Sequence, residues 1–213
     1  AVIGDTEITD ASEINDDNCA NQATMGGGIY SLGNLYIGYK LEDDATEFSA
    51  ENLVEDENST VTIQGNYANT TSNLGGGGVY VGGKFDMASG LISGNQANNG
   101  GGVMATATGE AEFTMTGGEI AGNSAAKGSG VYVGTCTFTM SGAARVNAGN
   151  DVYLASRQKI TIGGAFSGSD IVATITPTNY NTALEHPVLG GESELVESLC
   201  GRFAVTPGRT QSG

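Results

Sequence analysis

The sequence contains no tryptophan, only three prolines and only eight basic residues in a chain of 213. Against 24 carboxylates these bases leave a formal net charge of −16. Such a surface repels nucleic acid phosphates and anionic lipid headgroups, so we exclude nucleic acid as an expected partner. No apolar run approaches the roughly 20 residues of a membrane-spanning helix. We therefore expect no membrane span within this chain.

The sequence does contain a repeat, with three similar copies between residues 75 and 150. It reads GGGGVYVGGKFDMASGLISGNQANN, then GGGVMATATGEAEFTMTGGEIAGNSAAK, then GSGVYVGTCTFTMSGAARVNAGN. Alignment on the valines places Val79, Val103, Val131 and Val152 in register, with spacings of 24, 28 and 21 residues. A period of this size is typical of a solenoid, in which stacked repeats share one continuous core.

Apolar residues alternate with polar or small residues inside each repeat, as in Phe85 and Met87 or Phe138 and Met140. A period of two places alternate side chains on one face of a strand. Gly, Ser and Asn separate about three such strands per repeat, as expected for turns. The pattern predicts an all-β fold, a parallel β-helix in which each repeat forms one coil.

Three cysteines, Cys19, Cys136 and Cys200, are widely spaced and form no CxxC pair for zinc or redox chemistry. Counting inward positions back from the phenylalanines aligns Cys136 with Gly83 and Ala111. We therefore expect Cys136 to be a small buried filler of the core. Whether Cys19 and Cys200 pair is left open.

Asparagines recur at one turn of the repeats, where Asn66, Asn95 and Asn123 each follow an inward isoleucine by three residues. Stacked amides can hydrogen-bond from coil to coil, which predicts an asparagine ladder. In the next coil four residues separate Val146 from Asn150. We expect this insertion to disturb the ladder there.

The chain divides into three parts by its pattern. Residues 1–25 are predicted as an N-terminal cap or a degenerate first coil, and residues 26–166 as the parallel β-helix. Residues 167–213 are predicted as a C-terminal β-rich cap or the start of a following segment. Ile29 lies 50 residues before its equivalent Val79. We expect one regular coil in this interval plus a long acidic loop near 38–60, and long loops are often functional.

Phrases such as GGGVYV, FTMTGGEIAGN and DVYLAS resemble the repeats of bacterial cell-surface proteins of the pectin-lyase-like, right-handed parallel β-helix type. They are more loosely similar to the repeats of polymorphic outer-membrane proteins and autotransporter passengers, although the FxxN phrase of the polymorphic family is missing in register. The resemblance implies a secreted or cell-surface protein with an adhesive role. Its implied partner is a surface protein or a glycan of a host or of the surrounding community.

Catalysis was weighed because parallel β-helices also host pectate lyases and polygalacturonases. Polygalacturonases combine acidic residues with a histidine and an RxK phrase, which Arg157 to Lys159 spell here. The only histidine, His186, lies outside the repeats, and no further catalytic phrase accompanies the paired acids Asp16 and Asp17. We therefore expect no catalytic residues and no enzymatic activity.

Calcium is the one cofactor that the acidic loop suggests, because hard oxygen ligands on a flexible loop suit this ion. The candidate ligands are Asp43, Asp44, Glu47, Glu55, Asp56 and Glu57. Neither the EF-hand spacing nor the repeated calcium-solenoid phrase is present. The competing interpretation is a solvated acidic loop without bound metal, and otherwise we expect no cofactor.

The leading hypothesis is a non-enzymatic surface module that acts as a stalk or as a binding surface. The alternative is a carbohydrate-active or glycan-binding β-helix, similar to polysaccharide lyases and hydrolases. A line of outward aromatic residues across neighbouring coils would favour contact with a glycan. Tyr80 and Tyr132, with Met104 between them, are too few to decide from the sequence.

Overall fold

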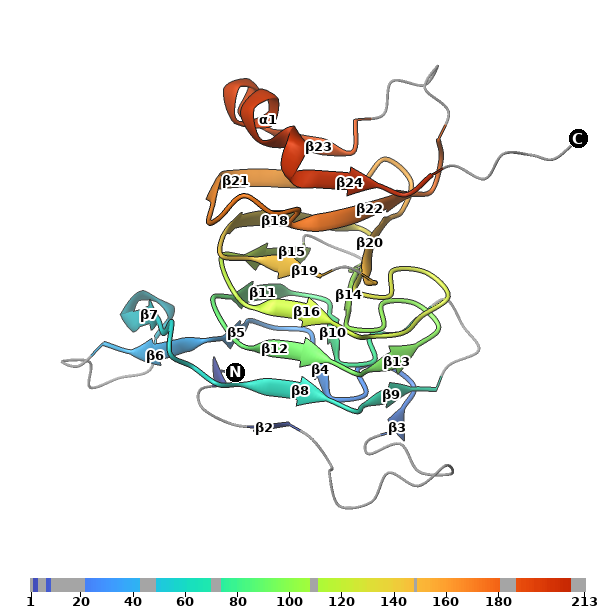
Figure 1. Ribbon diagram of the computed structural model, residues 1–213. Coiled ribbons are helices and arrows are strands. Elements are labelled where there is room, and N and C mark those ends of the chain that lie inside the picture. Colours follow the sequence, from blue (N-terminus) through green and yellow to red (C-terminus); the bar gives the residue numbers. More distant parts are fainter. Residues whose placement is uncertain are drawn as a thin grey trace, which may run out of the picture.

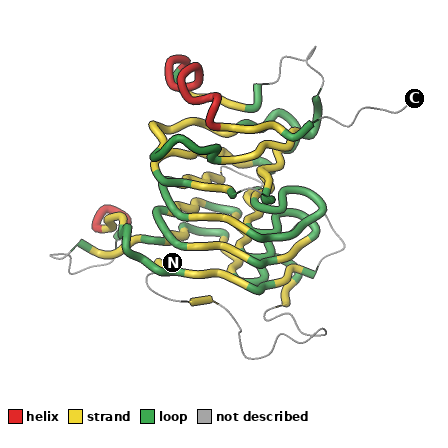
Figure 2. The backbone as a smooth tube through the Cα atoms, in the orientation of Figure 1, coloured by secondary structure: helices red, strands yellow, loops and turns green. Residues whose placement is uncertain are grey.

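The computed structural model describes residues 2–3, 7–8, 22–42, 49–69, 74–107, 111–147, 149–180 and 187–207. Within these ranges the protein is all-β, with many short strands in parallel sheets and one short α-helix, α1 (Ser193–Leu199). Figures 1 and 2 show the strands stacked in successive layers, with α1 at one end of the stack. The all-β prediction is confirmed at this level.

Four parallel sheets hold most of the strands, and the chain returns repeatedly to sheets A and D, less often to sheet B and least often to sheet C. Sheet A consists of β1 (Val2–Ile3), β5 (Leu35–Ile37), β11 (Lys84–Met87), β15 (Ala111–Met115), β18 (Cys136–Gly142), β21 (Ile160–Phe166) and β23 (Leu189–Gly191). Sheet B consists of β2 (Glu7–Ile8), β8 (Thr62–Gln64), β12 (Leu91–Ser93), β16 (Glu119–Ala121) and β19 (Arg145–Val146). Sheet C consists of β3 (Gln22–Ala23), β9 (Tyr67–Ala68) and β13 (Gln96–Ala97). Sheet D consists of β4 (Ile29–Ser31), β10 (Val79–Val81), β14 (Val103–Ala105), β17 (Val131–Val133), β20 (Asp151–Leu154), β22 (Ala173–Pro177) and β24 (Phe203–Val205).

The register of sheet D is the one that the repeated valines predict. Val79 pairs with Val103, Val103 with Val131, and Val131 with Val152. All four side chains are fully buried. Equivalent valines of successive repeats therefore stack on one another in sheet D. In this way repeats of different length build one core.

Period-two alternation also decides which residues of sheet A face the core. In β15 the apolar side chains are buried and Glu112 is exposed. Phe85 stacks on Phe113, and Phe113 on Phe138, with ring centroids 4.6 Å apart in both pairs. All three rings are fully buried, so a continuous aromatic stack runs through the core.

The predicted asparagine ladder is present, and it extends one step further than the sequence pattern suggests. The side-chain nitrogen of Asn66 donates to Asn95, that of Asn95 to Asn123, and that of Asn123 to Asn150, over 2.9 to 3.1 Å. The expectation that an insertion disturbs the ladder at Asn150 is therefore wrong. A turn closed by the hydrogen bond from the Asn150 N–H to the Asn147 carbonyl, 2.9 Å long, absorbs the extra residue.

The acidic insertion projects from the side of the stack and contains a two-stranded hairpin (Figure 1). Ile29 pairs directly with Val79, so the 50-residue interval is one coil with an insertion, as predicted. Within the insertion, β6 (Tyr39–Leu41) pairs antiparallel with β7 (Leu53–Glu55), which follows the 3-10 helix η1 (Ala50–Asn52).

The C-terminal segment continues sheets A and D through β22, β23 and β24. The short helix expected in this segment is α1, followed by the 3-10 helix η3 (Cys200–Arg202). Leu195, Val196 and Leu199 pack from α1 and its last turn against the hydrophobic core. The helix thus shields that end of the core from water. The domain boundaries near residues 25 and 166 remain predictions.

Cys136 is buried in the core cluster beside Ala111, with which it pairs in register. Its predicted role as a small filler is therefore confirmed. Burial raises the pKa of its thiol to about 12, because the charged thiolate loses its hydration there. Cys136 and the exposed Cys200 are both free thiols, and Cys19 lies outside the described residues.

Candidate functional site

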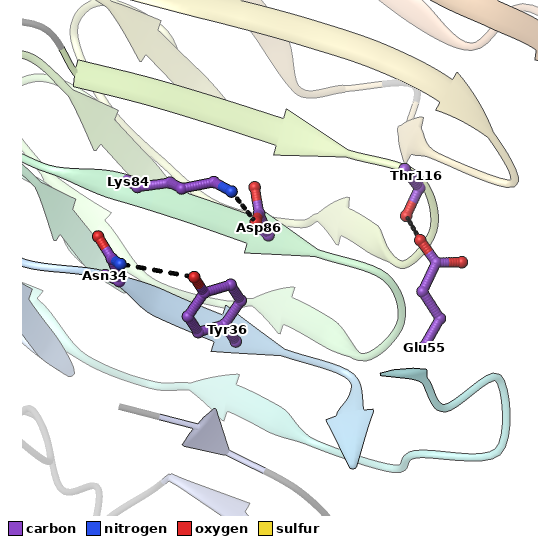
Figure 3. A network of polar contacts seen from close by, with 6 residues as sticks. All are labelled: Asn34, Tyr36, Glu55, Lys84, Asp86 and Thr116. Carbon is purple, nitrogen blue, oxygen red and sulfur yellow. Dashed lines mark hydrogen bonds and ion pairs between the residues drawn. The ribbon is translucent and has the colours of Figure 1, made fainter. Parts of the chain in front are cut away.

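The hairpin β6–β7 is fastened to the outward side of sheets A and B by a few specific hydrogen bonds. The Thr116 hydroxyl donates to a carboxylate oxygen of Glu55 over 2.7 Å (Figure 3). The Ser89 hydroxyl donates to the carbonyl of Asp56 over 2.8 Å, and the Asp56 N–H donates to the carbonyl of Gly38 over 2.8 Å. The end of β7 is thereby held on the stack, and the bond between Asp56 and Gly38 ties it to the residue before β6.

Beside the hairpin, sheet A carries a cluster of polar and aromatic side chains on its outward face (Figure 3). Lys84 forms an ion pair with Asp86 at 2.9 Å and lies 5.8 Å from the ring centroid of Tyr36. Tyr36 also packs edge to face against Tyr39 of the hairpin, with centroids 5.7 Å apart. Asp86 and Tyr36 are only 8% and 6% exposed, although both point away from the core.

Electrostatics in this cluster keep protons on Tyr39 and Lys84. Burial, and next the charges of Asp86 and Glu55, raise the pKa of the Tyr39 phenol to about 12, against a smaller opposing effect of its hydrogen bond with Thr116. The hydrogen bond to Asp86 raises the pKa of Lys84. Both groups therefore keep their protons at neutral pH and can donate hydrogen bonds. The cluster ties the hairpin to the sheet, and its carboxylates already have partners in Lys84 and Thr116.

A second feature is a column of outward side chains on sheet D, which we call the tyrosine column. The register aligns Tyr30, Tyr80, Met104, Tyr132 and Tyr153 across five successive coils. Tyr30 stacks on Tyr80 with centroids 5.0 Å apart, and Tyr132 stacks on Tyr153 at 5.2 Å. Tyr80 and Met104 are buried, and burial raises the pKa values of Tyr80 and Tyr132.

The tyrosine column is most exposed at its N-terminal end. At the N-terminal end Tyr30 is 47% exposed, and the neighbouring Leu32 is 63% exposed. Towards the other end, the Lys127 ammonium lies 5.6 Å from the ring centroid of Tyr153. Within each stacked pair the ring faces cover one another, so a ligand there would meet ring edges and hydroxyl groups.

The sequence analysis missed two members of this column. Tyr30 and Tyr153 each follow a residue that the valine alignment already placed in register, Ile29 and Val152. The repeated pair of an aliphatic residue and tyrosine was therefore a usable signal. No sequence pattern indicated the cluster around Asp86, because its members come together only when the hairpin folds back onto sheet A.

The residues weighed for catalysis are not brought together in the described part of the chain. Arg157 and Gln158 line a cavity of about 240 Å³ at the corner between β20 and β21, and Lys159 is not among its lining residues. His186, Asp16 and Asp17 lie outside the described residues.

Of the calcium candidates, Asp43, Asp44 and Glu47 lie outside the described residues, so for them the site stays a prediction. The other three are in the described chain, where Glu55 accepts the Thr116 hydroxyl and Asp56 accepts the Asn58 N–H over 3.1 Å. No group of three or more His, Cys, Asp or Glu residues in the described ranges is arranged to hold a metal ion. Glu55, Asp56 and Glu57 thus form no such group among themselves.

Comparison with protein-family models, curated proteins and solved structures gave no match for this chain. In the described ranges no helix is long and apolar enough to cross a membrane. The repeats and the surfaces described above are therefore the features that bear on function.

Proposed function

We propose that the stack is a right-handed parallel β-helix, and that it serves as a stiff, non-catalytic module of a secreted or cell-surface bacterial protein of the pectin-lyase-like type. In this role the coils are a spacer, and the hairpin and the corner loops are the surfaces that meet a partner. The observation that carries the proposal is the continuity of the side-chain ladders from coil to coil.

The ladders support stiffness because bending the stack would separate groups that are buried and fully paired. Asn95 illustrates this: its side-chain oxygen accepts both the backbone N–H and the side-chain N–H of Asn66, over 3.0 and 2.9 Å. Its side-chain nitrogen donates to the Ile63 carbonyl and to Asn123. Separating two coils here would leave several buried polar groups without partners, which is costly.

The partner class follows from charge and from the exposed loops. A net charge of −16 disfavours nucleic acid and anionic lipid surfaces. The partners that we propose are therefore a surface protein or a glycan of a host or of the surrounding community. Adhesion is the role that such a module serves.

The second candidate function is binding, or processing, of a glycan. The observation that favours it is the tyrosine column, because outward aromatic side chains at four of five aligned positions are the feature that a glycan surface would need. The stacking of its rings in pairs favours contact at the exposed Tyr30 over contact along the whole column.

Two measurements test the non-catalytic surface role. Intact cells that produce the protein are labelled with a reagent that does not cross membranes, and the purified chain is incubated with acidic and neutral polysaccharides in a reducing-end release assay. We expect labelling of the protein on intact cells and no release of sugar. Release that disappears in an Asp86→Asn variant would overturn the non-catalytic role, and absence of labelling would overturn the surface location.

A further inference from the structure

The N-terminal end of the tyrosine column holds two phenols that face each other from neighbouring coils. Tyr30 of β4 is the register partner of Tyr80 of β10, and adjacent strands of a sheet lie about 4.8 Å apart. The two rings stack with centroids 5.0 Å apart and an interplanar angle of 18°. The fold therefore brings into contact two phenols that lie 50 positions apart in the sequence.

The two members of this pair differ in exposure. Tyr30 is 47% exposed, so a reagent in solution reaches its ring, whereas Tyr80 is 8% exposed and lies beneath it. The next position of the column is Met104, which is buried and carries no phenol. Within the described ranges, a radical formed on Tyr30 thus has one stacked phenol with which it can exchange an electron, that of Tyr80.

The second stacked pair of the column has similar geometry but a different charge environment. Tyr132 and Tyr153 stack at 5.2 Å and 19°, and the Lys127 ammonium lies 5.6 Å from the ring centroid of Tyr153. A positive charge at this distance attracts the electrons of the ring and makes their removal more costly. No Lys or Arg of the described chain lies over the ring of Tyr30 or Tyr80. The N-terminal pair is therefore the easier one to oxidise.

We propose that Tyr30 and Tyr80 are an oxidative modification site, at which hydrogen peroxide and a haem peroxidase join the two rings as dityrosine. Each phenol loses one electron and its hydroxyl proton, and the two phenoxyl radicals form a carbon–carbon bond between ring carbons ortho to oxygen. These carbons then pass their hydrogens to the oxygens, which restores both phenols. The two electrons and two protons that are lost reduce one peroxide to two molecules of water.

Contact between the rings favours coupling within one molecule over coupling between molecules. Two groups that are held side by side react as if each were present at very high concentration. The new bond links β4, an edge strand of sheet D, to β10 in the next coil. It stabilises that edge, because a cross-link lowers the conformational entropy of the unfolded chain. The inference goes beyond the proposed function and does not depend on it.

Oxidation of the purified full chain with a haem peroxidase and hydrogen peroxide tests the site. Trypsin cleaves the denatured product after Lys40 and Lys84, which places the two tyrosines in different peptides. We expect the oxidised monomer to show dityrosine fluorescence and to yield these peptides joined, with a mass two hydrogen atoms below their sum. Oxidation should also raise the urea midpoint of the wild type.

Two variants identify the phenols that couple. Tyr30→Phe keeps a ring for stacking but lacks the hydroxyl group, so we expect it to lose both the joined peptides and the rise in the urea midpoint. Tyr67 lies in the same tryptic peptide as Tyr80 and is partly exposed in sheet C. Tyr67→Phe is therefore the matched control, and it should retain the joined peptides and the rise.

Absence of dityrosine from the oxidised monomer would overturn the proposal, as would joined peptides that persist in Tyr30→Phe. Coupling found only between molecules, with a yield that falls on dilution, would show that the stacked contact does not direct the reaction, and would also overturn it. Tyr132 and Tyr153 lie in two further tryptic peptides. A higher yield of those peptides joined would overturn the assignment to the N-terminal pair.

Discussion

Asn95 and Asn123 are joined twice across two coils: the side-chain oxygen of Asn123 accepts the Asn95 backbone N–H at 2.9 Å and its side-chain N–H at 3.0 Å. Both residues are almost fully buried. A single amide oxygen thus satisfies two donors of the neighbouring coil, and the same arrangement repeats at Asn66 and Asn150. No water is required to complete these bonds.

Replacing a central member of the ladder should therefore be costly. In Asn95→Ala the buried donors of Asn66 and the Ile63 carbonyl lose their partner, and we expect the free energy of unfolding to fall by about 2–4 kcal/mol. Asn58→Ala, at an exposed turn, should change it by about 0.5 kcal/mol or less. Urea unfolding measures both, and equal effects would mean that the ladder does not stabilise the stack.

The phenylalanine stack should respond to truncation in its middle. Phe113 is fully buried between Phe85 and Phe138, so Phe113→Ala leaves a cavity, and we expect a loss of about 3–5 kcal/mol. Thr114→Ala, its outward neighbour, should cost about 1 kcal/mol or less. Chemical denaturation of the two variants compares them, and a loss below that of Thr114→Ala would contradict the stack as a core element.

The base of the hairpin should tolerate no side chain at Gly38. Its φ is 78°, and a Cβ there would meet the Ser89 hydroxyl and backbone nitrogen, with the Ser89 Cα at 2.9 Å. We expect Gly38→Ala to cost about 1–3 kcal/mol and to speed hydrogen exchange in the hairpin β6–β7. Gly33→Ala, where no atom lies within 4 Å of the new Cβ, serves as the control. Unchanged exchange in Gly38→Ala would show that the hairpin is not fastened there.

The thiol of Cys136 should be unreactive in the folded protein. Burial raises its pKa to about 12, so almost no thiolate forms at neutral pH, and the side chain is inaccessible to reagents. In single-cysteine variants we expect a thiol reagent to label exposed Cys200 rapidly and to label Cys136 only on unfolding. Rapid labelling of native Cys136 would contradict its place in the core.

Tyr39 predicts a pH dependence of stability in alkali. An unfolded tyrosine loses its proton near pH 10.0, whereas the folded Tyr39 keeps it up to about pH 12. Between these values the unfolded state binds fewer protons, so the free energy of unfolding falls as pH rises. Tyr39→Phe lacks the group and should lose less stability over that window. Parallel urea titrations of both proteins give the difference, and identical slopes would show that the pKa of Tyr39 is not raised.

The sequence by itself determined the repeating core of this protein. The spacing of Val79, Val103, Val131 and Val152 predicted the register of sheet D, and the alternation around Phe113 predicted which side chains are buried. These features were readable because stacking brings the same position of every repeat to the same place. The position of a residue in one repeat therefore predicts the position of the equivalent residue in every other repeat.

Only the tertiary structure decided what happens where the repeat is interrupted. The ladder at Asn150 survives its insertion because a local turn absorbs one residue, whereas the turn 154–158 lines a cavity. The hairpin contacts of Glu55 with Thr116 join residues 61 positions apart, at a site that no periodicity relates. The repeat pattern does not predict where the side chains of an insertion lie, because their positions depend on how the loop folds back onto the stack.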